Sequence, residues 1–197
     1  MSEQYASSFE GASIAGKHND LVTKYLSDMS GLVGHVYQAI DKQVKGTQDE
    51  PDVNPLLSSI RDTLERQHIA LEARLEALGG QATSPVKEAG ASLLGIAAGV
   101  IDKLRSEEVS KNFRDNYTAL ALTHISYLML NTTSLAAGDP ATAELAGRGL
   151  RETAQIISDI GNLMPRLVVR DLSDEANLNA QAAEQARREY KEAWSNN

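Results

Sequence analysis

The sequence predicts an all-α protein built on four long helices, and three observations support this fold class. Apolar residues recur at spacings of three and four over long stretches, as they do on one face of an α-helix. Residue pairs that favour helix starts stand before three of the helical segments, namely Asn54-Pro55, Ser84-Pro85 and Asp139-Pro140. Aromatic residues make up only 5% of the 197 residues, and β-branched residues rarely alternate with polar ones, so we expect no sheet.

The composition excludes several classes of function. A formal net charge of −8 with dispersed basic residues opposes binding to nucleic acids and to anionic lipid surfaces. The absence of cysteine excludes disulfides, thiolate nucleophiles and cysteine metal sites. No signal-peptide pattern occupies residues 1–18, and the most apolar stretch, residues 89–101, is glycine-interrupted and shorter than the roughly 20 residues of a spanning helix. We therefore expect a cytoplasmic protein without nucleic-acid or membrane partners.

The first two long helices follow from their apolar stripes. We expect a flexible arm over residues 1–17, because that stretch has no apolar periodicity, and a helix from about His18 to Gly46. The second helix begins at Asn54-Pro55 and ends at Gly79-Gly80, a typical helix stop. Its expected inner face consists of Leu57, Ile60, Leu64, His68, Leu71, Leu75 and Leu78.

The second half of the bundle starts with a short Ala/Gly-rich helix over residues 85–104. A cap and acidic first turn at Ser106-Glu107-Glu108 predict the start of the third long helix, which runs to Gly138. Its expected inner face consists of Val109, Phe113, Tyr117, Leu120, His124, Leu128, Asn131 and Leu135.

The fourth long helix begins at Asp139-Pro140. Pro165 lacks an amide hydrogen, so we expect a kink or break over residues 161–164. A cap at Ser173-Asp174-Glu175 predicts a polar last helix that ends at about Trp194. The expected inner face of the fourth helix consists of Leu145, Gly149, Glu152, Ile156, Ile160 and Leu163. The predicted units are thus an arm at 1–17, a bundle at 18–170 and a helical extension at 171–197.

Connection lengths predict the topology. About nine residues join the first two long helices and about two join the last two, so each pair is expected to be antiparallel. About 27 residues separate the second helix from the third, enough to return along the bundle. Two antiparallel pairs joined by one long helical crossover form the ferritin-like arrangement of a four-helix bundle.

Ferritin-like carboxylate proteins bind two metal ions with inward Glu and His side chains, so each polar residue on a stripe is a candidate ligand. Glu65 and His68 form the Glu-x-x-His pattern, which equally fits a structural histidine. Glu152 is expected on an apolar stripe, where it is either a ligand or half of a buried salt bridge. His124 is the candidate on the third helix.

Residues 21–164 resemble the YciE/YciF-like branch of bacterial ferritin-like proteins. The resemblance is carried by the helix ending Leu71-Glu72-Ala73-Arg74-Leu75-Glu76-Ala77-Leu78-Gly79, by the crossover helix from Pro85 to Leu104, by Asp115-Asn116-Tyr117 and by Asp139-Pro140-Ala141-Thr142-Ala143-Glu144-Leu145. It implies a stress-associated protein, a dimeric bundle and, in some members, a di-iron site.

The ligand positions that the resemblance implies are mostly not occupied by ligands here. The carboxylates of the first and third helices fall near Met29 and on Thr118, and the histidine of the second falls nearer Gln67 than His68. Only Glu152 matches. The second Glu-x-x-His pattern is missing as well, because Gln155 follows Glu152 at that spacing.

Two hypotheses follow. The first is a non-catalytic, stress-associated ferritin-like protein that acts through self-assembly, as a homodimer, or through protein partners, without a cofactor. The second is a divergent iron or manganese protein with oxidase or peroxide-detoxifying activity, in which Glu65, His68, His124 and Glu152 bind the metal. The vacant ligand positions favour the first.

Overall fold

The computed structural model describes residues 2–80, 109–173 and 178–195, and all regular structure within these ranges is helical. The helices are α1 (Ser2–Gly46), α2 (Asn54–Ala77), α4 (Val109–Ala137), α5 (Pro140–Leu172) and α6 (Ala182–Ser195). The predicted all-α class is therefore confirmed for these ranges. The predicted crossover helix over 85–104 and the predicted helix start at Ser106-Glu107-Glu108 lie outside the described residues.

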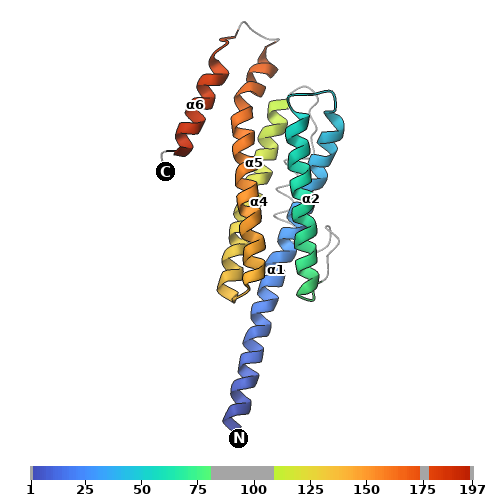
Figure 1. Cartoon of the computed structure of the whole chain (residues 1–197), viewed down its shortest axis with the longest axis vertical. Coiled ribbons are helices and arrows are strands. Elements are labelled where there is room, and N and C mark those ends of the chain that lie inside the picture. The colour runs from blue at the N-terminus through green and yellow to red at the C-terminus, as the bar shows by residue number, and fades with distance from the viewer. Residues whose placement is uncertain (1, 81–108, 174–177, 196–197) are drawn as a thin grey trace.

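Four of these helices form a closed bundle. Helix α1 packs against α2 and α4, and α5 packs against α4 and, less extensively, against α2. Figure 1 shows that α1 and α5 run in one direction while α2 and α4 run in the other, so neighbours around the ring are antiparallel. Helix α6 turns back and packs mainly against α5. None of the helices in the described ranges combines the length and apolarity needed to span a bilayer.

The inner faces of α1 and α2 lie where the apolar stripes predict them. Val22, Met29, Leu32, Val36 and Ile40 of α1 are buried in the common core. On α2 the buried positions are Leu57, Ile60, Leu64, Gln67, Leu71 and Leu75. Two expected positions differ. Gln67, and not His68, points inward, because the three-and-four spacing from Leu64 continues through residue 67. Leu78 lies one residue beyond the end of α2 and is only partly buried.

The inner face of α4 differs from the prediction over its second half. Leu128 and Leu135 were expected in the core but are 43% and 65% exposed, whereas Tyr127 and Leu130 are buried. The buried face of α4 consists of Phe113, Asn116, Ala119, Leu120, Thr123, Tyr127, Leu130 and Ser134. The prediction failed because apolar residues occur on all sides of this helix, so periodicity does not distinguish its two faces.

Both glycine stops act as predicted. Gly79 and Gly138 have φ angles of 77° and 74°, a left-handed conformation that a glycine adopts without steric cost. After α2 the amide of Gly80 donates to the Leu75 carbonyl, and after α4 the amide of Asp139 donates to the Ser134 carbonyl. These bonds satisfy carbonyls at the helix ends in the Schellman manner.

Of the two described Pro-containing start signals, one acts through its cap and the other does not. The Asp139 side chain accepts a hydrogen bond from the Thr142 amide, as a capping residue should. Asn54, in contrast, makes no cap, because its side-chain amide donates to the Val44 carbonyl and to Thr47 in the preceding turn. Asn54 therefore connects α2 to the end of α1.

Two predicted helix starts are wrong, and a predicted break is excluded. Helix α1 begins at Ser2 instead of His18, and Figure 1 shows its first turns extending beyond the bundle. Each residue that extends an existing helix adds a backbone hydrogen bond without a new nucleation step. Helix α5 continues through Pro165 to Leu172, so of the kink or break expected at residues 161–164 the break is excluded. The last helix begins at Ala182, because the Ser173 hydroxyl donates to the Arg170 carbonyl at the end of α5 instead of capping α6.

A buried pair of amides joins the two halves of the bundle. Gln43 on α1 and Asn116 on α4 are 6% and 1% exposed. Gln43 Nε2 donates to Asn116 Oδ1 at 2.9 Å, and Asn116 Nδ2 donates to Gln43 Oε1 at 2.7 Å. Each amide thus satisfies the other inside the core, which offsets the cost of burying them.

Replacing Arg74 with alanine tests a contact that ties the end of α2 to the start of α5. Arg74 Nη2 lies 2.8 Å from both Asp139 carboxylate oxygens, and its Nε donates to Thr142. Because these half-buried, charge-assisted bonds are lost, we expect Arg74→Ala to lower the free energy of unfolding by about 1–3 kcal/mol in urea titrations. Arg61→Ala, which removes only an exposed contact with the adjacent Asp62, should leave it nearly unchanged.

The pKa of Asp139 predicts a specific pH dependence. Burial alone would raise this pKa, but hydrogen bonds from Thr142 and Arg74 outweigh it and hold the pKa below its ordinary value of 3.8. The stabilisation by the ionised carboxylate is therefore present above pH 3.8 and is lost as the pH falls through the lower folded-state pKa. We expect Asp139→Asn to be less stable than the parent protein at pH 7, with the difference disappearing below about pH 4 in denaturant titrations. A difference that persists unchanged in acid would contradict this assignment.

Candidate functional site

A chain of hydrogen bonds joins three helices inside the bundle, and Gln67 is its central residue. The Tyr127 hydroxyl of α4 donates to Gln67 Oε1 at 3.1 Å, and Gln67 Nε2 of α2 donates to Glu152 Oε2 of α5 at 2.7 Å. Gln67 is 6% exposed and Tyr127 is 1% exposed. One amide therefore satisfies a buried phenol and a half-buried carboxylate from two other helices.

The protonation of the Tyr127 phenol agrees with its role as the donor to Gln67. Burial, followed by the nearby charge of Glu152, raises the pKa of Tyr127 well above its ordinary range, so the phenol stays protonated and acts as a donor. Its ring lies directly against the backbone of α5 at Gly149, where a Cβ atom would collide with it. Gly149 thus provides the space that allows the phenol to reach Gln67.

The chain faces a cleft of about 340 Å³ between α2 and α5. The cleft is lined by Gln67, Tyr127 and Glu152. Arg66 and Arg148 belong to its lining as well. The cleft therefore contains one carboxylate and two cations, a combination that resembles a solvated ion-pair network more than a site with several carboxylates.

The predicted ligands Glu65 and His68 lie on the α1 side of α2. His68 Nδ1 is 3.4 Å from the Ser30 hydroxyl and its Nε2 is 3.5 Å from a Glu72 carboxylate oxygen. Its ring rests against α1 at Gly34, where the absence of a side chain makes room for it. Glu65 is exposed and accepts a hydrogen bond from the Tyr37 hydroxyl at 3.4 Å.

The predicted ligand His124 lies on a different side of the bundle, against α5 and α6. His124 Nδ1 is 3.1 Å from the Leu150 carbonyl oxygen and 3.2 Å from the Thr153 hydroxyl. A carbonyl oxygen only accepts, so Nδ1 carries a hydrogen in this contact. Together with Trp194 and Lys191 of α6, His124 lines a cavity of about 440 Å³.

The four predicted ligands thus lie in three separate surroundings, with Glu65 and His68 together, His124 apart and Glu152 in the α2–α5 cleft. Among the described residues, no three His, Asp or Glu side chains come together in an arrangement that could hold a metal ion. The groups around Glu152 are an amide and a phenol. This donor set does not fit a di-metal centre, which needs several carboxylates to bridge and neutralise two cations.

Comparisons of the chain with protein-family models, with curated proteins and with solved structures found no match.

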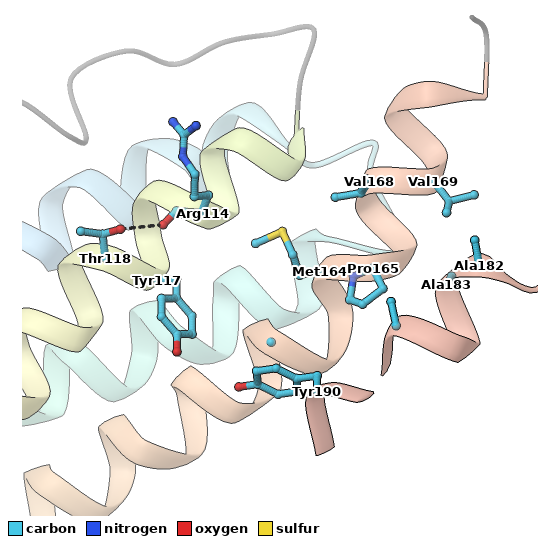
Figure 2. Close-up of a pocket in the computed structure, with 12 residues that line it drawn as sticks. Arg114, Tyr117, Thr118, Met164, Pro165, Val168, Val169, Ala182, Ala183 and Tyr190 are labelled. Atoms are coloured by element: carbon cyan, nitrogen blue, oxygen red, sulfur yellow. Dashed lines mark hydrogen bonds between the residues drawn. The ribbon is translucent and has the colours of Figure 1, made fainter. Parts of the chain in front are cut away.

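A third hollow region was not predicted from the sequence. It is a cavity of about 540 Å³ between α4, α5 and α6, with walls that include Tyr117, Met164, Val168, Ala186 and Tyr190. Figure 2 shows Tyr117 of α4 pointing toward Tyr190 of α6, with the valines of α5 opposite the first alanines of α6. One feature of the sequence could have indicated this cavity, because small residues recur on one face of the last helix.

Gln67 was also missed as a central residue, although its spacing contained the information. Residues 57, 60, 64, 67 and 71 follow alternating steps of three and four, which places Gln67 on the inner face of α2. His68 was preferred because histidine is a metal ligand. A polar residue at a core position is itself informative, since it needs a buried partner.

Gln67→Glu tests the hydrogen-bond chain through its pH dependence. The substitution places a second carboxyl group beside Glu152, and two carboxylates at that distance cannot both ionise without repulsion, so one pKa is raised. A raised folded-state pKa stabilises the protein at low pH and this stability is lost as the pH rises. We expect the variant to be about 2 kcal/mol or more less stable than the parent at pH 8, and nearly equal to it at pH 4–5, in denaturant titrations.

The matched control is Gln38→Glu, because Gln38 is exposed on the outer face of α1. It makes the same chemical change outside the bundle, so its effect on stability should be small at both pH values. Equal pH profiles for the two variants would show that Gln67 and Glu152 are not coupled.

Proposed function

We propose that the chain is a non-catalytic, ferritin-like four-helix bundle that acts by self-assembly into a homodimer. The ferritin-like part is supported by the order of the helices, with α1 between α2 and α4 and with α2 parallel to α4. Two antiparallel pairs with α2 parallel to α4 are the helix directions expected of a ferritin-like bundle. The association with stress responses rests on the sequence resemblance alone.

The observation that carries the proposal is the outer face of α4. Between Asp115 and Asp139 the sequence has no Asp, Glu, Lys or Arg. Large apolar side chains stand on the solvent side of this stretch, at positions that share one face of the helix. These residues, called here the α4 outer stripe, are Ile125, Leu128, Met129 and Leu135, and they are 43–65% exposed.

Exposed charged side chains interrupt the surfaces of the two neighbouring long helices. Arg66 and Glu76 of α2 are exposed, as are Arg148 and Arg151 of α5. A contiguous apolar stripe on one helix therefore marks a surface for contact with another molecule. It is the kind of surface that is buried when two bundles pack side by side.

A second copy of the chain is the partner that best fits this surface. Two copies with a formal net charge of −8 each repel one another over most of their surfaces, but not where charged groups are missing. A helix face made of Leu, Ile and Met is self-complementary, which a two-fold interface requires because the same patch serves both subunits. The dimer thus forms by antiparallel or crossed packing of two α4 helices.

Leu128→Glu tests this assembly. Leu128 is already 43% exposed, so a carboxylate should be tolerated in the monomer but would be buried next to its copy in the dimer. We expect the parent protein to sediment as a dimer and Leu128→Glu as a folded monomer, as judged by analytical ultracentrifugation and circular dichroism. A parent protein that sediments as a monomer would sink the proposal.

Ile69→Glu is the matched control, because Ile69 of α2 is 61% exposed but stands alone among charged neighbours. It places the same charge on an apolar surface residue outside the stripe and should leave the dimer intact. Monomers from both variants would point to a general effect of charge instead of a role of α4.

The metal-binding alternative requires a different arrangement of the four predicted ligands. It requires Glu65, His68, His124 and Glu152 to share an ion, which would need large movements of α2 and α4 relative to α5. Purified without metal-binding tags, the protein is expected to contain no stoichiometric iron or manganese by elemental analysis. Two ions per chain, lost in Glu152→Ala, would favour the alternative over the proposal.

A further inference from the structure

Helix α6 covers the seam between α4 and α5 without filling it. None of the residues of α6 is buried, although the helix lies along α5. Its inward face has alanines in the first half and the aromatic side chains of Tyr190 and Trp194 in the second. An amphipathic helix usually buries its apolar face, so the incomplete burial of α6 needs an explanation.

Tyr190 explains why α6 does not settle closer to α5. Its phenol ring presses against the backbone of α5 at Gly161, where a Cβ atom would collide with it. With the ring already touching backbone, the two helices cannot approach further at this point. The short side chains of Ala182, Ala183 and Ala186 then do not reach the opposite wall, and the 540 Å³ cavity is what remains.

The walls of this cavity are apolar except at one place. Met164, Pro165, Val168 and Val169 of α5 face the alanines of α6. The lining includes a single charged residue, Arg114, which is exposed and donates through Nε and Nη2 to the carboxylate of Asp115 at 2.8 and 2.6 Å. The positive charge of Arg114 is therefore already paired with the Asp115 carboxylate.

The polar place in the cavity combines hydroxyl groups with a backbone carbonyl group that has lost its usual helical donor. Pro165 has no amide hydrogen, so the Gly161 carbonyl oxygen lacks its donor four residues later in α5. Gly161 and Pro165 both line the cavity, as do the phenols of Tyr117 and Tyr190. Burial, followed by the proximity of Tyr117, raises the pKa of Tyr190, so this phenol is neutral at physiological pH.

We propose that the cavity between α4, α5 and α6 binds a neutral, largely apolar small molecule that carries one hydroxyl group. Its volume lies within the range of about 300–1,000 Å³ that is typical of small-molecule sites, and apolar walls with a few convergent polar groups are their usual chemistry. The hydroxyl hydrogen bonds to the phenols and to the Gly161 carbonyl, and the apolar body packs between Met164 and Ala186. Among the described residues that line the cavity, an anion finds only Arg114, which is paired with Asp115, and a cation finds no carboxylate.

Filling the cavity tests the proposal with Nile red, a neutral apolar dye, as the probe. We expect saturable binding of the dye to the full chain, seen as enhanced fluorescence. In Ala186→Leu the added side chain occupies the ligand space, so affinity for the dye should fall about tenfold or more while the melting temperature stays equal or rises. Met164→Phe, which fills the space from α5, should act in the same way without altering α6.

The control is Gln185→Leu, because Gln185 is exposed on the outer side of α6 and is not part of either cavity lining. It adds the same leucine to the same helix and should leave dye affinity unchanged. If Ala186→Leu and Met164→Phe bind the dye as well as the parent does, the dye lies elsewhere and the proposal is wrong.

A set of three competitors tests the hydroxyl group. 1-Naphthol should displace Nile red at lower concentration than naphthalene, and 1-naphthoate, an anion of similar size, should displace it least. In Tyr190→Phe the ring remains against Gly161 but its hydroxyl is lost, so the preference for naphthol over naphthalene should shrink. Equal displacement by naphthol and naphthalene in the parent protein, or stronger displacement by naphthoate, would overturn the assigned chemistry. The dimer is a separate measurement, so either proposal can fail without the other.

Discussion

The packing of the bundle depends on the way in which one amide, that of Gln67 on α2, satisfies polar groups from two other helices. The seam between α2 and α5 is the least extensive of the four helix contacts around the ring. At this seam the Gln67 side chain donates to Glu152 and accepts from Tyr127. Without it, the buried Tyr127 phenol would lose a partner that water cannot replace at that depth, and the half-buried Glu152 carboxylate would lose a protein donor. An apolar residue of the same size would fill the space but leave the phenol unsatisfied.

The sequence predicted the core of the first two helices well because polar and apolar residues alternate there with a clear helical period. Charged residues mark the outer faces of α1 and α2, so the inner faces follow by elimination. Helix α4 offers no such contrast, because its central part has no charged residue on either side. Tyr127 was therefore left out of the core, and Leu128, one residue later, was placed in it. The feature that defeated the prediction is the same one that marks α4 as a contact surface.

The candidate site was predicted less well than the fold, and the reason is geometric. Successive residues on a helix differ by about 100° in direction, so an error of one position moves a side chain to another neighbour. His68 faces α1 while Gln67 faces the bundle interior. Two predicted helix caps failed because another backbone carbonyl took the same side chain. Asn54 bonds to the end of α1, and Ser173 bonds to the end of α5.

The reciprocal amide pair of Gln43 and Asn116 has a consequence for how the two halves of the bundle are aligned. Leucine-rich surfaces of helices remain compatible after sliding by one turn, about 5.4 Å, because they bury similar area in either position. The amide pair is not compatible with such a slip, since both side chains would then be buried against aliphatic groups without partners. α1 and α4 are distant in the sequence, and no short loop sets their relative height. The two amides therefore specify the axial alignment of α1 with α4. They contribute little net attraction, but their hydrogen bonds form in only one alignment of the two helices.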